Sequence, residues 1–261
     1  YMNNTDGTFT NQTQKAGIAA IGYFKGVDSG DLNNDGYPDL YLSNFNGQNL
    51  LYFNQGAETG VEFKLAPDSL NVSEPIQSFS TWIFDYNNDG FEDIFVSAYS
   101  DVERSSANIF MANLRLLEDP RVEKRTPKLY KNNGDGTFTN VSHEMGLNEP
   151  LSTMGCNFGD LDNNGYLDFY AATGDPSYIS IVPNKMYRNV EGKTFEDVTF
   201  SGGFGHIQKG HAVGFGDLDM DGDQDIYAVM GGAYEGDNFR NLLFENPIGN
   251  QNNWINIQLE G

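Results

Sequence analysis

The stretch DLNNDGYPD, residues 31–39, places oxygen-bearing side chains at alternating positions around a glycine. Asp31, Asn33, Asp35 and Asp39 supply the oxygens, and Gly36 permits a sharp reversal of the backbone between them. Two interpretations fit so polar a stretch. It is either a solvated turn or a loop whose oxygens surround a cation.

The nine-residue stretch recurs three times, as DYNNDGFED (85–93), DLDNNGYLD (160–168) and DLDMDGDQD (217–225). We name the four copies loops one to four in chain order, and we number their positions 1 to 9. Position 6 is glycine in every copy, and position 1 and position 9 are aspartate in every copy. Four copies with the same phase of oxygen ligands favour the cation loop over a turn without an ion.

A second element recurs out of phase with the loops and predicts a β-hairpin. It begins at Tyr1, Leu51, Leu129, Met186 and Leu242, and it reads as an apolar-aromatic run, Asn/Gly turn residues and another apolar run. Strand-like runs follow the loops at 40–44, 93–99, 168–173 and 225–230, and others precede them at 80–84, 155–158 and 211–215. Four strands in each unit predict an all-β protein, a β-propeller with blades of four antiparallel strands.

The spacing of the loops sets the expected organisation. We expect blades over residues 1–250, with an insertion near 101–128 in the longest interval between loops. The stretch 107–119 within it can form a short helix, and the insertion is interpreted either as a decorating loop or as a partner-docking element on the propeller rim. Four loops are too few for a ring of six to eight blades with one loop each. A partial propeller, or part of a longer chain, is therefore expected. The start at Tyr1 fits a processed chain or a piece of a longer chain.

Calcium is the ion that the loops predict, at about four per chain. It takes six to eight oxygen ligands from carboxylates, amides, backbone carbonyls and water, whereas Mg²⁺ prefers fewer protein ligands. An EF-hand is excluded, because position 12 falls on Leu42, Val96, Ala171 and Ala228 within strands. Side chains at positions 1, 3, 5 and 9 and the carbonyl of position 7 are the expected ligands: Asp31, Asn33, Asp35, Tyr37, Asp39; Asp85, Asn87, Asp89, Phe91, Asp93; Asp160, Asp162, Asn164, Tyr166, Asp168; Asp217, Asp219, Asp221, Asp223, Asp225.

Charge and composition exclude several classes of partner and site. The formal net charge of −22 makes a nucleic-acid partner improbable, since phosphate binding needs a basic face. No run of 18 apolar residues is present, so no transmembrane segment is expected. Cys156 is the one cysteine, which excludes an intrachain disulfide, and it is interpreted as an inert buried thiol.

One further cluster stands apart from the loops. GHIQKGH places His206, Lys209 and His211 beside the strand that enters loop four. These side chains either pair with acidic neighbours and backbone or form a polar ligand site. No catalytic residues are assigned, because no nucleophile, zinc-protease or phosphate-loop motif is present.

The repeated D-x-[DN]-x-[DN]-G-x-x-D loop resembles that of the FG-GAP/VCBS repeat family, whose loops lie in β-propeller blades. The segments from Gly159 and Gly202, together with NNWINIQLEG (252–261), resemble the ASPIC/UnbV proteins. In that family the tryptophan segment opens a C-terminal region, so residues 251–261 are expected to be its truncated start. The resemblance implies calcium, a propeller and an exported protein, and it implies no established reaction.

Two functions from different classes follow. The first is a calcium-rigidified propeller, extracellular, periplasmic or at the cell surface. It would bind protein or glycan there, in a larger outer-membrane or extracellular assembly. The alternative is a polysaccharide-active enzyme, a lyase or hydrolase, with its site near His206, Lys209 and His211.

Overall fold

The computed structural model describes residues 1–56, 61–99, 124–174, 182–232, 235–236, 238–247 and 249–251. Within these ranges all regular structure is β, apart from 3-10 turns at Asp68–Leu70 and Gly249–Gln251. Most of the insertion expected near 101–128 lies outside the described residues. So does the segment 252–261, on which the expected ASPIC/UnbV start falls.

The described strands form four blade sheets and one separate two-stranded hairpin, and in every sheet the sequence order and the spatial order agree. Blade one contains β3 (Phe24–Gly30), β4 (Asp39–Asn44), β5 (Leu50–Asn54) and β6 (Phe63–Leu65). Blade two contains β7 (Ser78–Phe84), β8 (Asp93–Ala98), β9 (Lys128–Asn132) and β10 (Phe138–Asn140). Blade three contains β11 (Thr153–Gly159), β12 (Asp168–Thr173), β13 (Lys185–Asn189) and β14 (Phe195–Asp197). Blade four contains β15 (Gly210–Gly216), β16 (Asp225–Met230) and β17 (Leu242–Phe244), and a separate hairpin contains β1 (Met2–Asn3) and β2 (Phe9–Thr10).

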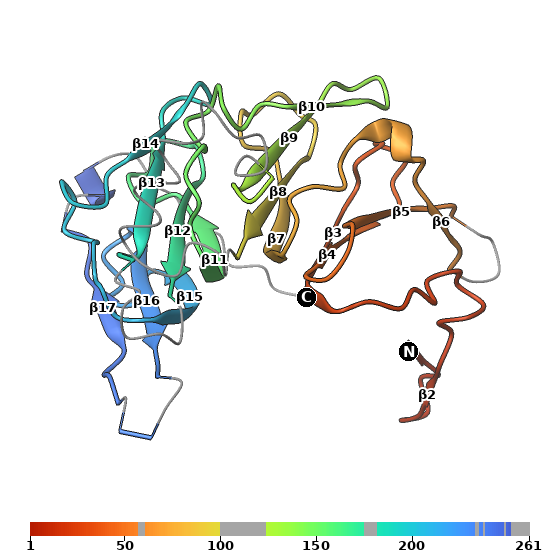
Figure 1. The fold of residues 1–261 in the computed structure, drawn as a ribbon, viewed down its shortest axis with the longest axis horizontal. Helices are drawn as coiled ribbons and strands as arrows, with labels where there is room; N and C mark the ends of the chain where they lie inside the picture. Colours follow the sequence, from red (N-terminus) through yellow and green to blue (C-terminus); the bar gives the residue numbers. More distant parts are fainter. Residues whose placement is uncertain are drawn as a thin grey trace.

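The blades follow one another along an arc, each presenting its first strand to the next blade (Figure 1). Strand β3 lies beside β7, β7 beside β11, and β11 beside β15. All pairings within the sheets are antiparallel. The predicted all-β propeller blades are therefore confirmed, and every nine-residue loop joins the first strand of a blade to the second.

The strands that follow the loops form where the sequence predicts them, but β3 has no clear sequence signal. Its sequence, FKGVDSG, is rich in glycine and polar residues and lacks an apolar face. It nevertheless pairs with β4 in the register of the other blades, with Gly30 opposite Asp39. The same register places Phe84, Gly159 and Gly216 opposite the last aspartate of their own loops.

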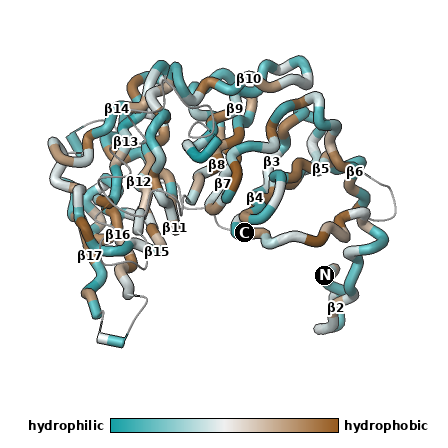
Figure 2. Tube along the Cα trace, viewed as in Figure 1, coloured by the Kyte–Doolittle hydropathy of each residue, from teal (hydrophilic) through white to brown (hydrophobic). Residues whose placement is uncertain are grey.

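Hydrophobic side chains pack between the blades, because each strand presents alternate residues to its two neighbouring blades. In β8, Ile94 and Val96 pack with Tyr41 of blade one, whereas Phe95 packs with Phe169 of blade three. Three buried clusters fill the three spaces between consecutive blades. Figure 2 shows the hydrophobic segments concentrated within the strands of the sheets. Packing of hydrophobic side chains therefore holds the blades together, in addition to hydrogen bonds between neighbouring sheets.

The spacing between blades varies with the residues of the first strands. Blades three and four approach closely at Gly155. The absence of a side chain there leaves room for β15, since an added Cβ would collide with the carbonyl oxygen of His211. Blades two and three are instead separated by aromatic rings. Trp82 stacks on Phe95 at 4.2 Å and lies 5.7 Å from the ring of Phe158. Small residues and aromatic rings therefore set the curvature of the arc.

The close approach at Gly155 gives a test of this packing. Gly155→Ala should lower the free energy of unfolding by about 1–3 kcal/mol, the usual cost of overpacking a tight contact. Gly214→Ala is the matched control on β15, since an added Cβ there meets nothing within 4 Å. Denaturant unfolding of both variants would measure the difference. Equal stabilities would contradict the close contact between β11 and β15.

Candidate metal centre

All four nine-residue loops are built in the same way around the aspartate of position 1. In loop one, Asp31 accepts the backbone N–H of Asp35 at 3.0 Å and that of Gly36 at 2.7 Å. The aspartate of position 1 accepts the corresponding two N–H groups in the other loops, at 2.8–3.1 Å. This side chain therefore fixes the reversal of the backbone in every loop.

Two positions of each loop adopt left-handed backbone conformations. Position 6 is the glycine, with φ between 86° and 98° in the four loops. A Cβ there would meet nothing within 4 Å at Gly36, Gly90 or Gly165, so glycine is needed for its backbone conformation and not for space. Position 4 is Asn34, Asn88, Asn163 or Met220, with φ between 52° and 65°. Asparagine tolerates this region better than other side chains, which explains its recurrence.

Position 5 adds a further turn within each loop. Its side-chain oxygen accepts the backbone N–H of position 7: Asp35 accepts that of Tyr37 at 2.9 Å, and Asn164 accepts that of Tyr166 at 2.7 Å. Asp89 and Asp221 accept the same bond, at 3.1 and 3.3 Å. The side chain of position 5 is thereby fixed against the backbone of its own loop.

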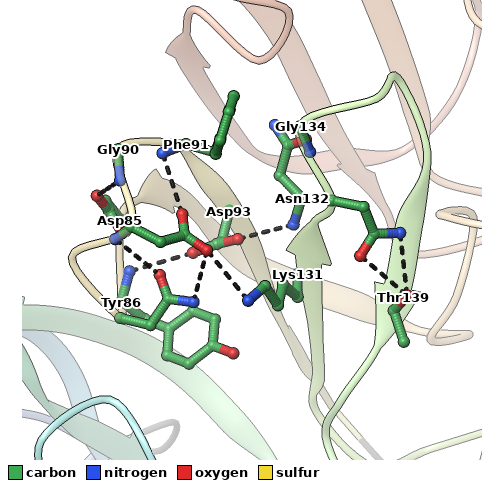
Figure 3. Close-up of polar contacts among 12 residues, drawn as sticks. Asp85, Tyr86, Gly90, Phe91, Asp93, Lys131, Asn132, Gly134 and Thr139 are labelled. Carbon is green, nitrogen blue, oxygen red and sulfur yellow. Dashed lines mark hydrogen bonds and ion pairs between the residues drawn. The ribbon is translucent and has the colours of Figure 1, made fainter.

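The aspartate of position 9 is buried in every blade, at 0–1 % exposure. In loop two, Asp93 accepts the backbone N–H of Tyr86 at 3.2 Å and that of Asn132 at 2.8 Å (Figure 3). The equivalent aspartates Asp39, Asp168 and Asp225 each accept the same pair of bonds. Position 9 therefore ties the loop to the third strand of its own blade.

Sequence analysis missed the asparagine that completes this arrangement. It ends the third strand or follows it, as Asn54, Asn132, Asn189 and Asn246. Its signal was present in the recurring hairpin element, where the same asparagine closes YFN, YKN, YRN and FEN. The hairpin pattern accounts for it as a turn residue, and its aspartate partner lies 15 residues away for Asn54 and 39 residues away for Asn132.

In loops three and four, carboxylate oxygens converge in a way that suits a hard divalent cation. One carboxylate oxygen from each of Asp160, Asp162 and Asp168 lies within 4.8 Å of the others, and Asp217, Asp219 and Asp221 converge equally in loop four. Loops one and two carry an amide, Asn33 or Asn87, at position 3. A set of carboxylate, amide and carbonyl oxygens with no nitrogen or sulfur ligand is the set that calcium prefers. The residues thus fit the ion that the sequence predicts.

Burial changes the acidity of the position 9 aspartates. It raises the pKa of Asp39 to about 6 and the pKa values of Asp93 and Asp168 to about 7. The bound N–H groups lower these pKa values in part, and repulsion from the other carboxylates of the same loop raises them again. Without a cation, each of these loops contains a carboxylate that is costly to ionise at neutral pH. A cation would remove that cost.

The three residues of the separate polar cluster occupy different surroundings. His206 is half-buried, and its Nδ1 accepts the backbone N–H of Gln208 at 3.2 Å. Lys209 is buried, and His211 is exposed at the start of β15. Cys156 is partly buried rather than fully buried as predicted, and desolvation raises the pKa of its thiol to about 12, which disfavours the reactive thiolate.

Comparison with known proteins finds a repeat family in the same part of the chain as the first three blades. The FG-GAP-like repeat matches residues 1–42, 31–96 and 120–171, which together make up more than half of the chain. The chain belongs to the FG-GAP-like repeat family. The sheets of this family member are accordingly propeller blades, and the described blades form part of a propeller.

Curated relatives of this FG-GAP-like repeat protein include cartilage acidic protein 1 from three vertebrates. The human protein is 27% identical over 183 residues, which cover 64% of this chain and 27% of the human protein. The Mus musculus protein is 25% identical, and the match covers 62% of this chain and 27% of the mouse protein. The Xenopus tropicalis protein is 24% identical, and the match covers 67% of this chain and 25% of the frog protein. The chain spans about a quarter of the length of these relatives. The predicted resemblance to the ASPIC/UnbV proteins is thereby confirmed.

The described part of the chain contains no helix of the length and hydrophobicity needed to cross a membrane.

The raised pKa values predict how stability depends on pH. Because the folded pKa values of Asp39, Asp93 and Asp168 exceed the ordinary value of 3.8, the folded state binds more protons than the unfolded state. The melting temperature of calcium-stripped protein should therefore fall as pH rises from about 4 to about 7. Calorimetry in metal-free buffers would measure it.

A variant separates this effect from the general repulsion of an acidic protein. Asp93→Asn combined with Asp168→Asn should flatten the fall between pH 4 and pH 7, since an amide cannot ionise, whatever its effect on stability at low pH. A melting temperature of stripped wild-type protein that rises over this interval would contradict the assignment.

Proposed function

We propose that this protein is a calcium-stiffened propeller segment that recognises a protein or glycan outside the cytoplasm. The observation that supports this proposal most directly is the repeated loop. In all four copies the same hydrogen bond from the position 6 N–H to the position 1 aspartate fixes the turn, and in loops three and four three carboxylates converge. A turn that served only to reverse the chain would not need three or four oxygen ligands in the same phase.

The expected ligands of each ion are the side chains at positions 1, 3, 5 and 9 and the backbone carbonyl of position 7. In loop three these are Asp160, Asp162, Asn164, Asp168 and the carbonyl of Tyr166. The ion would neutralise carboxylates that otherwise repel one another, and four ions at +2 each would reduce the formal charge from −22 to −14. Binding energy of this kind adds to folding stability, because the unfolded chain has no preformed site.

The role in recognition follows from the stiffness of the blades. Packed sheets hold their connecting loops at fixed positions, which suits a binding surface. The similarity to cartilage acidic protein 1 and the FG-GAP-like repeats supports an interaction module. We place it in the extracellular space, in the periplasm or at the cell surface, where a larger outer-membrane or extracellular assembly would be its partner. The fold does not identify the ligand, so direct binding measurements are needed to identify the protein or glycan that is recognised.

Calcium content and thermal stability test the first part of the proposal. Purified protein should contain about four calcium ions per chain by elemental analysis, and a calcium chelator should lower its melting temperature by several degrees or more. Excess Mg²⁺ in place of Ca²⁺ should restore little of the loss, because it retains water and tolerates fewer protein ligands. Calcium-free protein with an unchanged melting temperature would contradict the proposal.

The charges of the loops predict the order in which they release calcium. Loop four has aspartate at positions 1, 3, 5 and 9, whereas the other loops have three aspartates and one asparagine at these positions. Ligand charge strengthens calcium binding, so loop four should empty last in a chelator titration. Asp219→Asn should remove this difference, with Asp162→Asn in loop three as the matched variant. Loop four emptying first in the unaltered protein would overturn the order.

A further inference from the structure

An asparagine on the third strand connects the loops of neighbouring blades. The backbone N–H of Asn132 bonds Asp93 of its own loop two. Its side-chain amide reaches the preceding blade and donates to the carbonyl oxygen of Leu32 in loop one, at 2.7 Å. Leu32 is position 2, between the expected ligands at positions 1 and 3. One residue therefore contacts both loops.

The same bridge is present at the other two blade boundaries. Asn189 donates to the carbonyl of Tyr86 in loop two at 2.8 Å, and Asn246 donates to that of Leu161 in loop three at 2.6 Å. Both carbonyls belong to position 2. We call Asn132, Asn189 and Asn246 the bridging asparagines. Together they form a continuous polar connection through all four loops.

A second contact runs between the loops themselves. The side chain of Asn88, at position 4 of loop two, donates to the carbonyl of Gly165 in loop three at 2.8 Å. Asn163 of loop three donates in the same way to Gly222 of loop four, at 3.0 Å. Both acceptors are at position 6. Loops two and three are thus joined twice, once through Asn189 and once through Asn88.

The bridges are buried, which gives them energetic weight. Asn132 is 2 % exposed and Asn189 is 0 % exposed, and each bonds a fully buried aspartate. A buried carbonyl or amide that loses its partner is left unsatisfied and cannot be compensated by water. If one loop shifts when its ion leaves, the bridging asparagine must either follow it or break a buried bond. The position of each loop is therefore dependent on that of its neighbour.

We propose that the bridging asparagines couple calcium binding in neighbouring loops, so that an ion in one loop raises the calcium affinity of the next. This inference rests on the proposed calcium binding. An ion in loop three would fix Asp168, which fixes the backbone of Asn189. The side chain of Asn189 would then hold the carbonyl of Tyr86 between Asp85 and Asn87 in loop two. The coupling is reciprocal by thermodynamic necessity.

Asn54 provides a natural contrast within the chain. Like the bridging asparagines, it bonds its own position 9 aspartate through its backbone N–H, and its amide donates to the carbonyl of position 8. Its recorded side-chain donation stays inside blade one, at Pro38. Asn54→Ala therefore removes the same local bond as Asn189→Ala and leaves the contact between loops two and three intact.

The experiment measures each loop separately in the full chain. The amide of each position 6 glycine bonds the position 1 aspartate, so the NMR signals of Gly36, Gly90, Gly165 and Gly222 report on their own loops. Calcium is titrated in buffers of fixed free concentration. Asp162→Ala weakens loop three, and the Gly90 signal then reports the response of loop two.

The expected result is a rise of about 5-fold or more in the calcium concentration that half-saturates loop two when Asp162→Ala is introduced. In the Asn189→Ala, Asn88→Gly background, Asp162→Ala should no longer change the half-saturation of loop two. In the Asn54→Ala background the response should persist. If the Asn189→Ala protein does not fold, Asn88→Gly alone provides the test. It removes the exposed contact between Asn88 and Gly165, places at position 88 a residue that tolerates a positive φ, and should reduce the response of loop two.

The outcomes distinguish the two proposals. Four loops that bind calcium independently in the unaltered protein would overturn the coupling and leave the proposed function standing. Persistence of the full response in the Asn189→Ala, Asn88→Gly protein would also overturn the role of the bridges. Glycine signals that do not respond to calcium at all would overturn both.

Discussion

The buried aspartate at position 9 is the residue on which the architecture of each blade depends. It stands at the start of the second strand, opposite the last residue of the first strand, and it accepts backbone N–H groups from the loop and from the third strand. One side chain thus fixes three elements at once. Its burial is costly for a charged group, and the two N–H donors offset only part of the cost. The raised pKa values of Asp39, Asp93 and Asp168 are consistent with a remaining cost, which a bound cation would offset.

The sequence predicts the parts of this structure that depend on local backbone geometry. The loops, their glycines and the strands after them follow from residues within about ten positions of one another, where turn chemistry and alternation act directly. Strand β3 could not be predicted in this way. Its glycines and polar residues have no strand pattern, and it forms because β4 pairs with it and β7 of the next blade packs against it.

The candidate site shows the same division. The aspartates and asparagines of the loops can be predicted from the sequence, because they recur at positions 1, 3, 5 and 9 of each nine-residue stretch. Asn132 and its equivalents were not, since their partners come from another part of the blade and from the preceding blade. A recurring asparagine in a hairpin element is ordinarily explained by its turn, so only the packed structure separates that explanation from a contact between blades.

The bridges have a consequence for how such repeats can be exchanged. A blade, as a sheet, runs from its first strand to its last, but its loop is completed by an asparagine of the following sheet. A segment that keeps one loop complete therefore runs from the first strand of its own sheet to the end of the third strand of the next sheet. A chimaera joined at the boundary between two sheets would separate the loop before the junction from the amide that holds its backbone, even though every strand remained whole.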